Sequence, residues 1–134
     1  DNVDYFLYKF NLSKKDQKRI QNIDAFYKQK INSKSFSENM MNKVFYFNGK
    51  QAVIDILNFK IVSSKKLDNS LIELCKLFLE KEVPVLPIGA DILMTKYKIP
   101  QGKQLGAKLK IIEEEWVKNN FKITDQEIYN IVNS

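Results

Sequence analysis

Residues 89–116 read GADILMTKYKIPQGKQLGAKLKIIEEEW, and this stretch constrains the fold more than any other part of the chain. A Gly-x-Asp turn opens it, a short apolar segment follows, and Pro100 and Gly102 interrupt the chain before a long amphipathic segment. Proline and glycine favour turns, whereas the flanking residues keep a helical spacing. We therefore predict a short helix over residues 92–97, capped by Asp91, and a longer helix over residues 103–119, joined by a tight corner.

The predicted longer helix has one apolar stripe. At 100° per residue its large apolar side chains fall within an arc of roughly 60°, as expected for a helix with one buried face. These side chains are Leu105, Leu109, Ile112 and Trp116. Because Trp116 extends the stripe, we interpret it as a core residue rather than as a platform for a nucleic-acid base.

The rest of this segment is basic. Between residues 95 and 112 there are five lysines and no acidic residue. Lys103 and Lys110 project opposite to the apolar stripe, and Lys108 lies on its flank. Gly102 and Gly106 carry no Cβ atom, so a neighbouring helix or an RNA phosphate can approach the backbone closely near the positive end of the helix dipole. The candidate RNA-binding residues are Lys96, Lys98, Gly102, Lys103, Gly106, Lys108 and Lys110.

The remainder of the chain is helical in pattern. Six of its seven glycines and prolines lie between residues 84 and 106, and alternating strand patterns are short or absent. We predict an all-α fold, a bundle or helical array of about 6–8 helices with a Pro/Gly-rich corner at residues 84–106. The expected organisation is a single helical domain over residues 1–134. It would comprise entry helices (1–35), central helices (36–83) and a tail (84–134).

Local signals place the helices of the first half. Residues 2–10 have the pattern of the end of a longer helix, and Ser13 is suited to cap a helix that runs to about Ile31. The predicted core stripe of that helix is Ile20, Ile23, Tyr27 and Ile31. Residues 51–62 are apolar on more than one side, which predicts a central, well-buried helix.

Further capping signals place the remaining helices. Ser37 opens a helix that Asn48 and Gly49 end. Asp68 begins the next one, whose predicted inward side chains are Leu71, Leu74, Cys75 and Phe78. Thr124 and Glu127 match a capping box, so the last helix is expected to begin there.

The residue types present exclude several classes of function. The chain has no histidine, which rules out histidine-based acid–base catalysis, the usual nucleophilic triads and most zinc sites. Cys75 is the only cysteine, so no disulfide can form within the chain. Glu113, Glu114 and Glu115 point about 100° apart on a helix and cannot converge on a metal ion. We expect no catalytic residue, metal site or cofactor in this chain.

The net charge of +6 and the pI of about 9.3 permit nucleic-acid binding without identifying it, because richness in Lys, Asn and Ile is also typical of AT-rich genomes. A second basic cluster is equally consistent with an RNA-facing surface and with a solvated one: Lys14, Lys15, Lys18, Arg19, Lys28, Lys30 and Lys34. No apolar run approaches the roughly 20 residues that a membrane span needs. We expect a cytoplasmic protein without a membrane partner.

The segment quoted above resembles the C-terminal signature of bacterial tRNA nucleotidyltransferases, the CCA-adding and poly(A)-polymerase-like enzymes. The residues that carry the resemblance are Gly89, Asp91, Ile92, Leu93, Pro100, Gly102, Gly106, Leu109, Glu113 and Trp116. Residues 11–15 also look like the Leu-Ser-Asn-x-Glu helix start of that family, but only residues 89–121 are specific. The chain departs from the family at Lys103, where proline is frequent, and at Lys108, where the family has an arginine-rich first turn.

The resemblance implies a concrete function. Enzymes of this family add C, C and A to the 3′ end of tRNA from CTP and ATP, with two magnesium ions bound in a head domain. The chain contains neither the Asp-x-Asp pair nor the Gly-Gly pair of that head, so the head would be a separate partner. The chain is thereby expected to be the helical C-terminal portion that grips the acceptor and T-arm backbone of tRNA.

Two other functions remain open. One is a helical protein–protein interaction module whose apolar surface lies around Phe45, Tyr46 and Phe47; at least one ring of this run is expected to face outward and the others to be buried under the central helix. The other is dimerisation of the intact enzyme. Whether the parent adds CCA, CC, A or poly(A) depends on residues that this chain does not contain.

Overall fold

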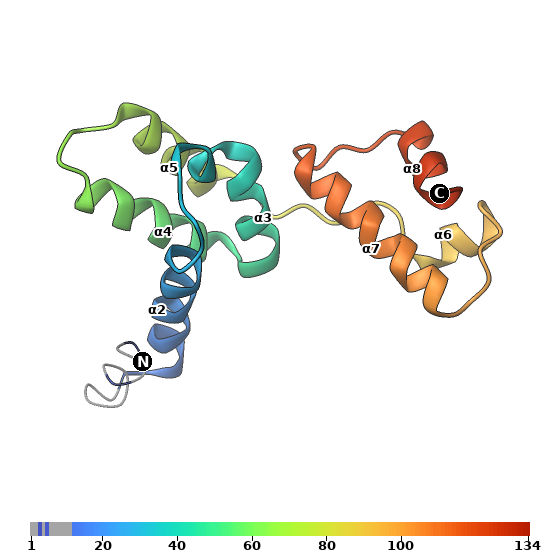
Figure 1. Cartoon of the computed structure of the whole chain (residues 1–134), viewed down its shortest axis with the longest axis horizontal. Helices are drawn as coiled ribbons and strands as arrows, with labels where there is room; N and C mark the ends of the chain where they lie inside the picture. The colour runs from blue at the N-terminus through green and yellow to red at the C-terminus, as the bar shows by residue number, and fades with distance from the viewer. Residues whose placement is uncertain (1–2, 4, 6–11) are drawn as a thin grey trace. The chain divides into compact units, whose positions relative to one another are not determined.

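The computed structural model describes Val3, Tyr5 and residues 12–134. The helix expected over residues 2–10 and the match at Asn11 therefore lie outside the described residues, apart from Val3 and Tyr5. The described part of the chain contains seven α-helices and one 3₁₀ helix and no strand, so the all-α prediction is confirmed (Figure 1). None of these helices is long and apolar enough to cross a bilayer.

The chain divides into two compact units, Asp1–Val83 (unit 1) and Pro84–Ser134 (unit 2). The boundary falls where the sequence analysis places the start of the tail. It lies in a non-helical connection that contains Pro84 and Pro87, inside the predicted Pro/Gly-rich corner. The organisation as a single domain stays a prediction, and each unit is described below by itself.

Unit 1 contains the first helices, and most begin at a polar cap. Its elements are α2 (Lys14–Tyr27), η1 (Ser33–Phe36), α3 (Glu38–Asn48), α4 (Lys50–Ser63) and α5 (Asn69–Glu80). The side chains of Ser13, Ser37 and Asp68 accept hydrogen bonds from backbone N–H groups in the first turns of α2, α3 and α5, as their sequence positions predict. Gly49 ends α3 with φ +92°, a left-handed conformation that favours glycine.

The core of unit 1 is built around α4, which contacts α2, α3 and α5. Residues 52–57 of α4 are all buried, which confirms the prediction of a central helix. Phe45 of α3 and Phe78 of α5 are fully buried, and their ring centroids are 5.2 Å apart. Phe47 is 51% exposed, so the aromatic run of α3 has one ring inside and one outside, as predicted.

Helix α2 differs from its prediction in two ways. It ends at Tyr27 rather than near Ile31, and its only buried side chain is that of Phe26. The predicted stripe of Ile20, Ile23 and Tyr27 is half-buried. Ile20 and Ile23 face a groove between α2 and α4 instead of a closed core, whereas the hydroxyl of Tyr27 donates to the carbonyl of Ile56 in α4.

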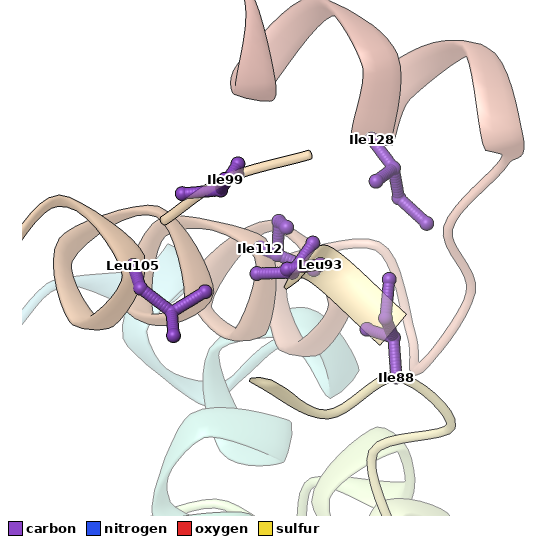
Figure 2. Close-up of a cluster of buried hydrophobic side chains, with 6 residues drawn as sticks. All are labelled: Ile88, Leu93, Ile99, Leu105, Ile112 and Ile128. Atoms are coloured by element: carbon purple, nitrogen blue, oxygen red, sulfur yellow. The ribbon is translucent and has the colours of Figure 1, made fainter. Parts of the chain in front are cut away.

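Unit 2 contains α6 (Ala90–Thr95), α7 (Lys103–Lys118) and α8 (Asp125–Val132). Helix α7 contacts both α6 and α8. The core is a cluster of buried aliphatic side chains, drawn in Figure 2: Ile88, Leu93, Ile99, Leu105, Ile112 and Ile128. Leu105, Ile112 and Trp116 are buried and Leu109 is partly buried against the cluster, so the predicted stripe of α7 is confirmed.

The end of α7 is a Schellman motif. The N–H of Phe121 donates to the carbonyl of Trp116 over 2.7 Å, and Asn120 adopts a left-handed conformation with φ +57°. The ring of Phe121 packs edge-on against Trp116 at a centroid distance of 5.0 Å. Trp116 is 3% exposed, which confirms its interpretation as a core residue.

Candidate nucleic-acid interface

The candidate residues extend from the end of α6 through the corner into the first half of α7. The N–H of Ile99 donates to the carbonyl of Leu93 over 3.1 Å and folds the chain back after α6. Lys98, one residue earlier, adopts φ +59°. A left-handed backbone is uncommon for residues other than glycine, so the turn holds Lys98 in a conformation that its own chemistry does not favour.

Lys108 is committed to an internal contact. Its Nζ donates to the carbonyl oxygens of Ile131 (3.0 Å) and Ser134 (2.7 Å) and to the hydroxyl of Ser134 (3.2 Å). A cation at the C-terminal carbonyls of a helix is favourable both as a hydrogen-bond donor and through the helix dipole. Lys108, placed among the RNA-binding candidates from its position on the flank of the stripe, thus lies at the end of α8.

Lys96 is partly engaged. Its Nζ lies 4.0 Å from the carboxylate of Asp125 and 5.5 Å from the centroid of the Tyr97 ring. Lys96 and Asp125 are both exposed, so the pair is worth little to stability. The side chain of Lys96 can turn to another anion at small cost.

Lys98, Lys103 and Lys110 are exposed, and their ammonium groups have no hydrogen bond or ion pair with any residue that the structure describes. Lys103 and Lys110 are seven positions apart on α7 and so lie on one face, about 10 Å apart along the axis. Gly106 lies between them and is also exposed. Lys103, Gly106 and Lys110 thus form one exposed face of α7, apart from the exposed Lys118 and Lys122 of the same unit.

The two glycines do not serve packing within the chain. A Cβ atom built on Gly102 or on Gly106 would meet no heavy atom within 4 Å. Of the two bodies that could approach these glycines, a helix of the described chain does not do so, and the approach of an RNA phosphate stays a prediction. Gly102 is required by its backbone, with φ +145°, whereas Gly106 has an ordinary helical environment and no internal reason to be glycine.

Asp91 does not have its predicted role. Helix α6 begins at Ala90 with Gly89 as the N-cap and without a side-chain cap, so Asp91 lies inside the first turn. The carboxylate still matters locally, because a Cβ on Gly89 would come within 2.9 Å of Asp91 Oδ1. The Gly-x-Asp pair thus reflects close packing of the turn.

The charge at the start of α7 opposes the helix dipole. The first turn contains no acidic residue, Lys103 begins the helix, and Glu113, Glu114 and Glu115 lie in its second half. Helix stability favours the reverse order, with acids near the N-terminus and bases near the C-terminus. Lys118 in the last turn follows the favourable order, so only the N-terminal end of α7, with Lys103 and no acid, opposes the dipole.

The basic cluster of unit 1 is partly neutralised. Arg19 makes a bidentate pair with Asp55, with Nε and Nη2 each 2.9 Å from a carboxylate oxygen. Burial alone would raise the pKa of Asp55, but hydrogen bonds from Arg19 and Gln51 outweigh it and hold that pKa below its usual value. The sequence analysis did not predict this pair. Asp55 is the single acidic residue in the apolar run of residues 52–57, and a buried acid there indicates a basic partner.

Cys75 and the acidic side chains are the remaining groups with potential chemistry in the described part of the chain. No group of three potential metal-ligating side chains occurs among these residues. Cys75 is half-buried, with its Sγ 3.7 Å from Asn58 Oδ1, and burial raises the pKa of its thiol. A thiol with a raised pKa is a poor nucleophile.

Comparisons with known proteins add no support to the resemblance to tRNA nucleotidyltransferases, which rests on the sequence motif of residues 89–121. No protein-family model, no curated protein and no solved structure matches the chain.

Proposed function

We propose that unit 2 binds the phosphate backbone of folded tRNA, as the C-terminal portion of a tRNA nucleotidyltransferase whose head domain carries the chemistry. The observation that carries the proposal is the exposed face of α7 on which Lys103 and Lys110 flank Gly106. Two unpaired ammonium groups supply charge, and the glycine lets a polyanion reach the helix surface.

Two further features support the proposal. Glycine inside an exposed helix costs about 1 kcal/mol relative to alanine, and Gly106 has no internal contact that requires it. Lys103 at the N-terminal end of α7 and the left-handed backbone of Lys98 also oppose local stability. Features that weaken a fold without an internal reason are typical of binding surfaces. The proposal that the ligand is tRNA comes from the resemblance of residues 89–121 to the nucleotidyltransferase signature.

The test is a fluorescence-anisotropy titration of the chain with tRNA at several salt concentrations. Backbone binding gives a log–log slope of about −0.9 per phosphate contact on a duplex, and little dependence on base sequence. The variant Lys103→Glu/Lys110→Glu should lose at least about tenfold in affinity. Lys118→Glu/Lys122→Glu, with the same change of charge on exposed lysines of the same unit, should lose far less. Equal loss in the two variants would refute a defined surface on α7.

One observation favours the alternative, a helical protein–protein interaction module. Met40 and Phe47 are each 51% exposed and lie seven positions apart, on one side of α3. Exposed large apolar side chains on one helix face are found at interaction sites. If the chain binds no tRNA and self-associates in analytical ultracentrifugation, and Phe47→Ser abolishes that association, this alternative replaces the proposal.

A further inference from the structure

A pocket in unit 1 is lined by residues of η1, the end of α4 and the first half of α5. It has a volume of about 580 Å³, within the range of pockets that hold small ligands. Its apolar lining residues, called the floor below, are Ile31, Phe36, Leu71 and Leu74. Phe36 and Leu71 belong to the core, whereas Ile31 and Leu74 are half-buried. An apolar group that covers this floor is removed from water, which favours its binding.

The positive charge at this pocket is Lys60, in the last turn of α4. The residue is half-buried, and its Nζ lies 5.5 Å from the centroid of the Phe36 ring. No hydrogen bond or ion pair engages this ammonium group within the part of the chain that the structure describes. A cation that has lost part of its hydration without gaining an acceptor is a favourable partner for an anionic group.

The negative charge at the pocket is Asp68, the N-cap of α5. Its Oδ1 accepts hydrogen bonds from the N–H and the hydroxyl of Ser70, and the hydroxyl bond is the main cause that holds the pKa of Asp68 below its usual value. The N–H of Leu71 and the charge of Lys60 lower that pKa further. A carboxylate has about four acceptor positions, so these three donors leave one for a ligand.

We infer that the pocket binds a zwitterion with an apolar body, namely a free α-amino acid with a large apolar side chain. The carboxylate of the ligand lies at Lys60, its ammonium group at Asp68 and its side chain on the floor. Asp68 repels a ligand that is only an anion and Lys60 repels one that is only a cation, whereas a molecule with both charges satisfies both residues. The inference does not depend on the tRNA-binding proposal, because the pocket belongs to unit 1 and the RNA-binding candidates to unit 2.

The test is a titration of the ¹⁵N-labelled chain with L-phenylalanine, followed by amide NMR. Saturable shifts are expected at Phe36, Leu71 and Leu74. Three ligands that each lack one feature should bind at least about tenfold more weakly. They are N-acetyl-L-phenylalanine (no ammonium group), L-phenylalaninamide (no carboxylate) and glycine (no side chain). Any of the three that binds as tightly as L-phenylalanine would overturn the inference, as would the absence of shifts at about 20 mM, well above a millimolar dissociation constant.

A variant of Lys60 tests the position of the ligand carboxylate. Lys60→Met keeps an unbranched side chain and removes the charge, so affinity for L-phenylalanine should fall at least about tenfold, without a loss of affinity for L-phenylalaninamide. The matched control is Lys65→Met, which removes an exposed lysine of the connection between α4 and α5 that does not line the pocket. Equal weakening in both variants would show a diffuse field and overturn the assignment.

A variant of Asp68 tests the position of the ligand ammonium group. Asp68→Asn keeps a residue that caps helices well but removes the charge. Affinity for L-phenylalanine should fall at least about tenfold, and affinity for N-acetyl-L-phenylalanine should not fall. Glu73→Gln, at an exposed acid of α5 outside this pocket, is the control and should bind like wild type. Binding of L-phenylalanine that persists in Lys103→Glu/Lys110→Glu keeps this result separate from the fate of the tRNA proposal.

Discussion

The two units reach a stable core by different routes. Unit 1 buries several phenylalanine rings around a helix that is covered on several sides, whereas unit 2 buries mainly aliphatic side chains between three helices, together with the ring of Trp116. Charge also differs: unit 1 has fifteen Lys and Arg against ten acidic residues, and unit 2 has seven lysines against six. The unit with the smaller excess charge nonetheless holds the segment in which five lysines occur without an acid. Local segregation of charge, rather than net charge, distinguishes its surface.

The largest expected effect tests whether the two cores are independent. Phe45→Ala removes a fully buried ring that packs on Phe78, and it should lower the free energy of unfolding of unit 1 by about 3–5 kcal/mol. Native-state hydrogen exchange measures the loss in α3, α4 and α5. If the units unfold separately, the amides of α7 keep their protection.

A matched truncation in unit 2 completes this comparison. Ile112→Ala removes a fully buried side chain of the aliphatic cluster, and it should deprotect α7 while α4 is unaffected. If either variant deprotects all helices equally, the chain unfolds as one cooperative domain, and the division into units has no energetic counterpart.

The next effect concerns the ion pair of unit 1. Arg19→Met leaves the carboxylate of Asp55, which is 8% exposed, without its bidentate partner, and should destabilise unit 1 by less than a core truncation, because Arg19 reaches solvent. The control is Lys28→Met, which removes an exposed pair with Asp24 and should change stability by about 0.5 kcal/mol or less. Urea unfolding curves compare the two variants.

The pH dependence of the same pair follows from the lowered pKa of Asp55. A carboxyl whose folded pKa is depressed contributes stability above its unfolded pKa of about 3.9, and this contribution is lost as pH falls through the folded pKa. The stability gap between wild type and Arg19→Met should therefore be full at pH 7 and close below pH 4. A gap of constant size would mean that Arg19 acts through packing of its aliphatic stem.

The contact of Lys108 with α8 gives a smaller effect. Lys108→Met keeps the length of the side chain but removes three hydrogen bonds to the end of α8, with an expected loss of about 1 kcal/mol in the local stability of that helix. Lys110→Met is the control, because Lys110 has no partner among the described residues. Hydrogen exchange of α8 should rise only in Lys108→Met. An unchanged exchange rate would show that Lys108 does not stabilise α8, and Lys108 would then count among the lysines that can bind RNA.

Local signals in the sequence predicted most of the fold. Helix caps at Ser13, Ser37, Asp68 and Thr124 and the stripe of α7 depend on neighbouring residues, and the structure confirms them. The groove beside α2 was not predicted. The spacing of Ile20 and Ile23 indicates an apolar helix face, but it does not determine how much of that face another helix buries. Burial is a tertiary property at such positions.

The candidate site was predictable as a segment but not residue by residue. Periodicity placed Lys108 on a flank of α7, but only the path of α8 decides that its ammonium group meets the carbonyls of Ile131 and Ser134. The same limit applies to Gly106: the sequence shows that something can approach the helix there, and the fold shows that nothing within the described chain does.

Gly106 therefore provides the smallest change and separates stability from binding. Gly106→Ala adds a methyl group into open space on a helix, so it should stabilise unit 2 by about 1 kcal/mol through helix propensity. A phosphate that contacts the helix backbone would meet the new methyl group, so tRNA affinity should fall although the fold is more stable. Thermal unfolding and anisotropy titration of the same variant measure both quantities. A variant that is more stable and binds tRNA as tightly as wild type would move the phosphate contact away from the backbone at Gly106, leaving only the lysine side chains to make it.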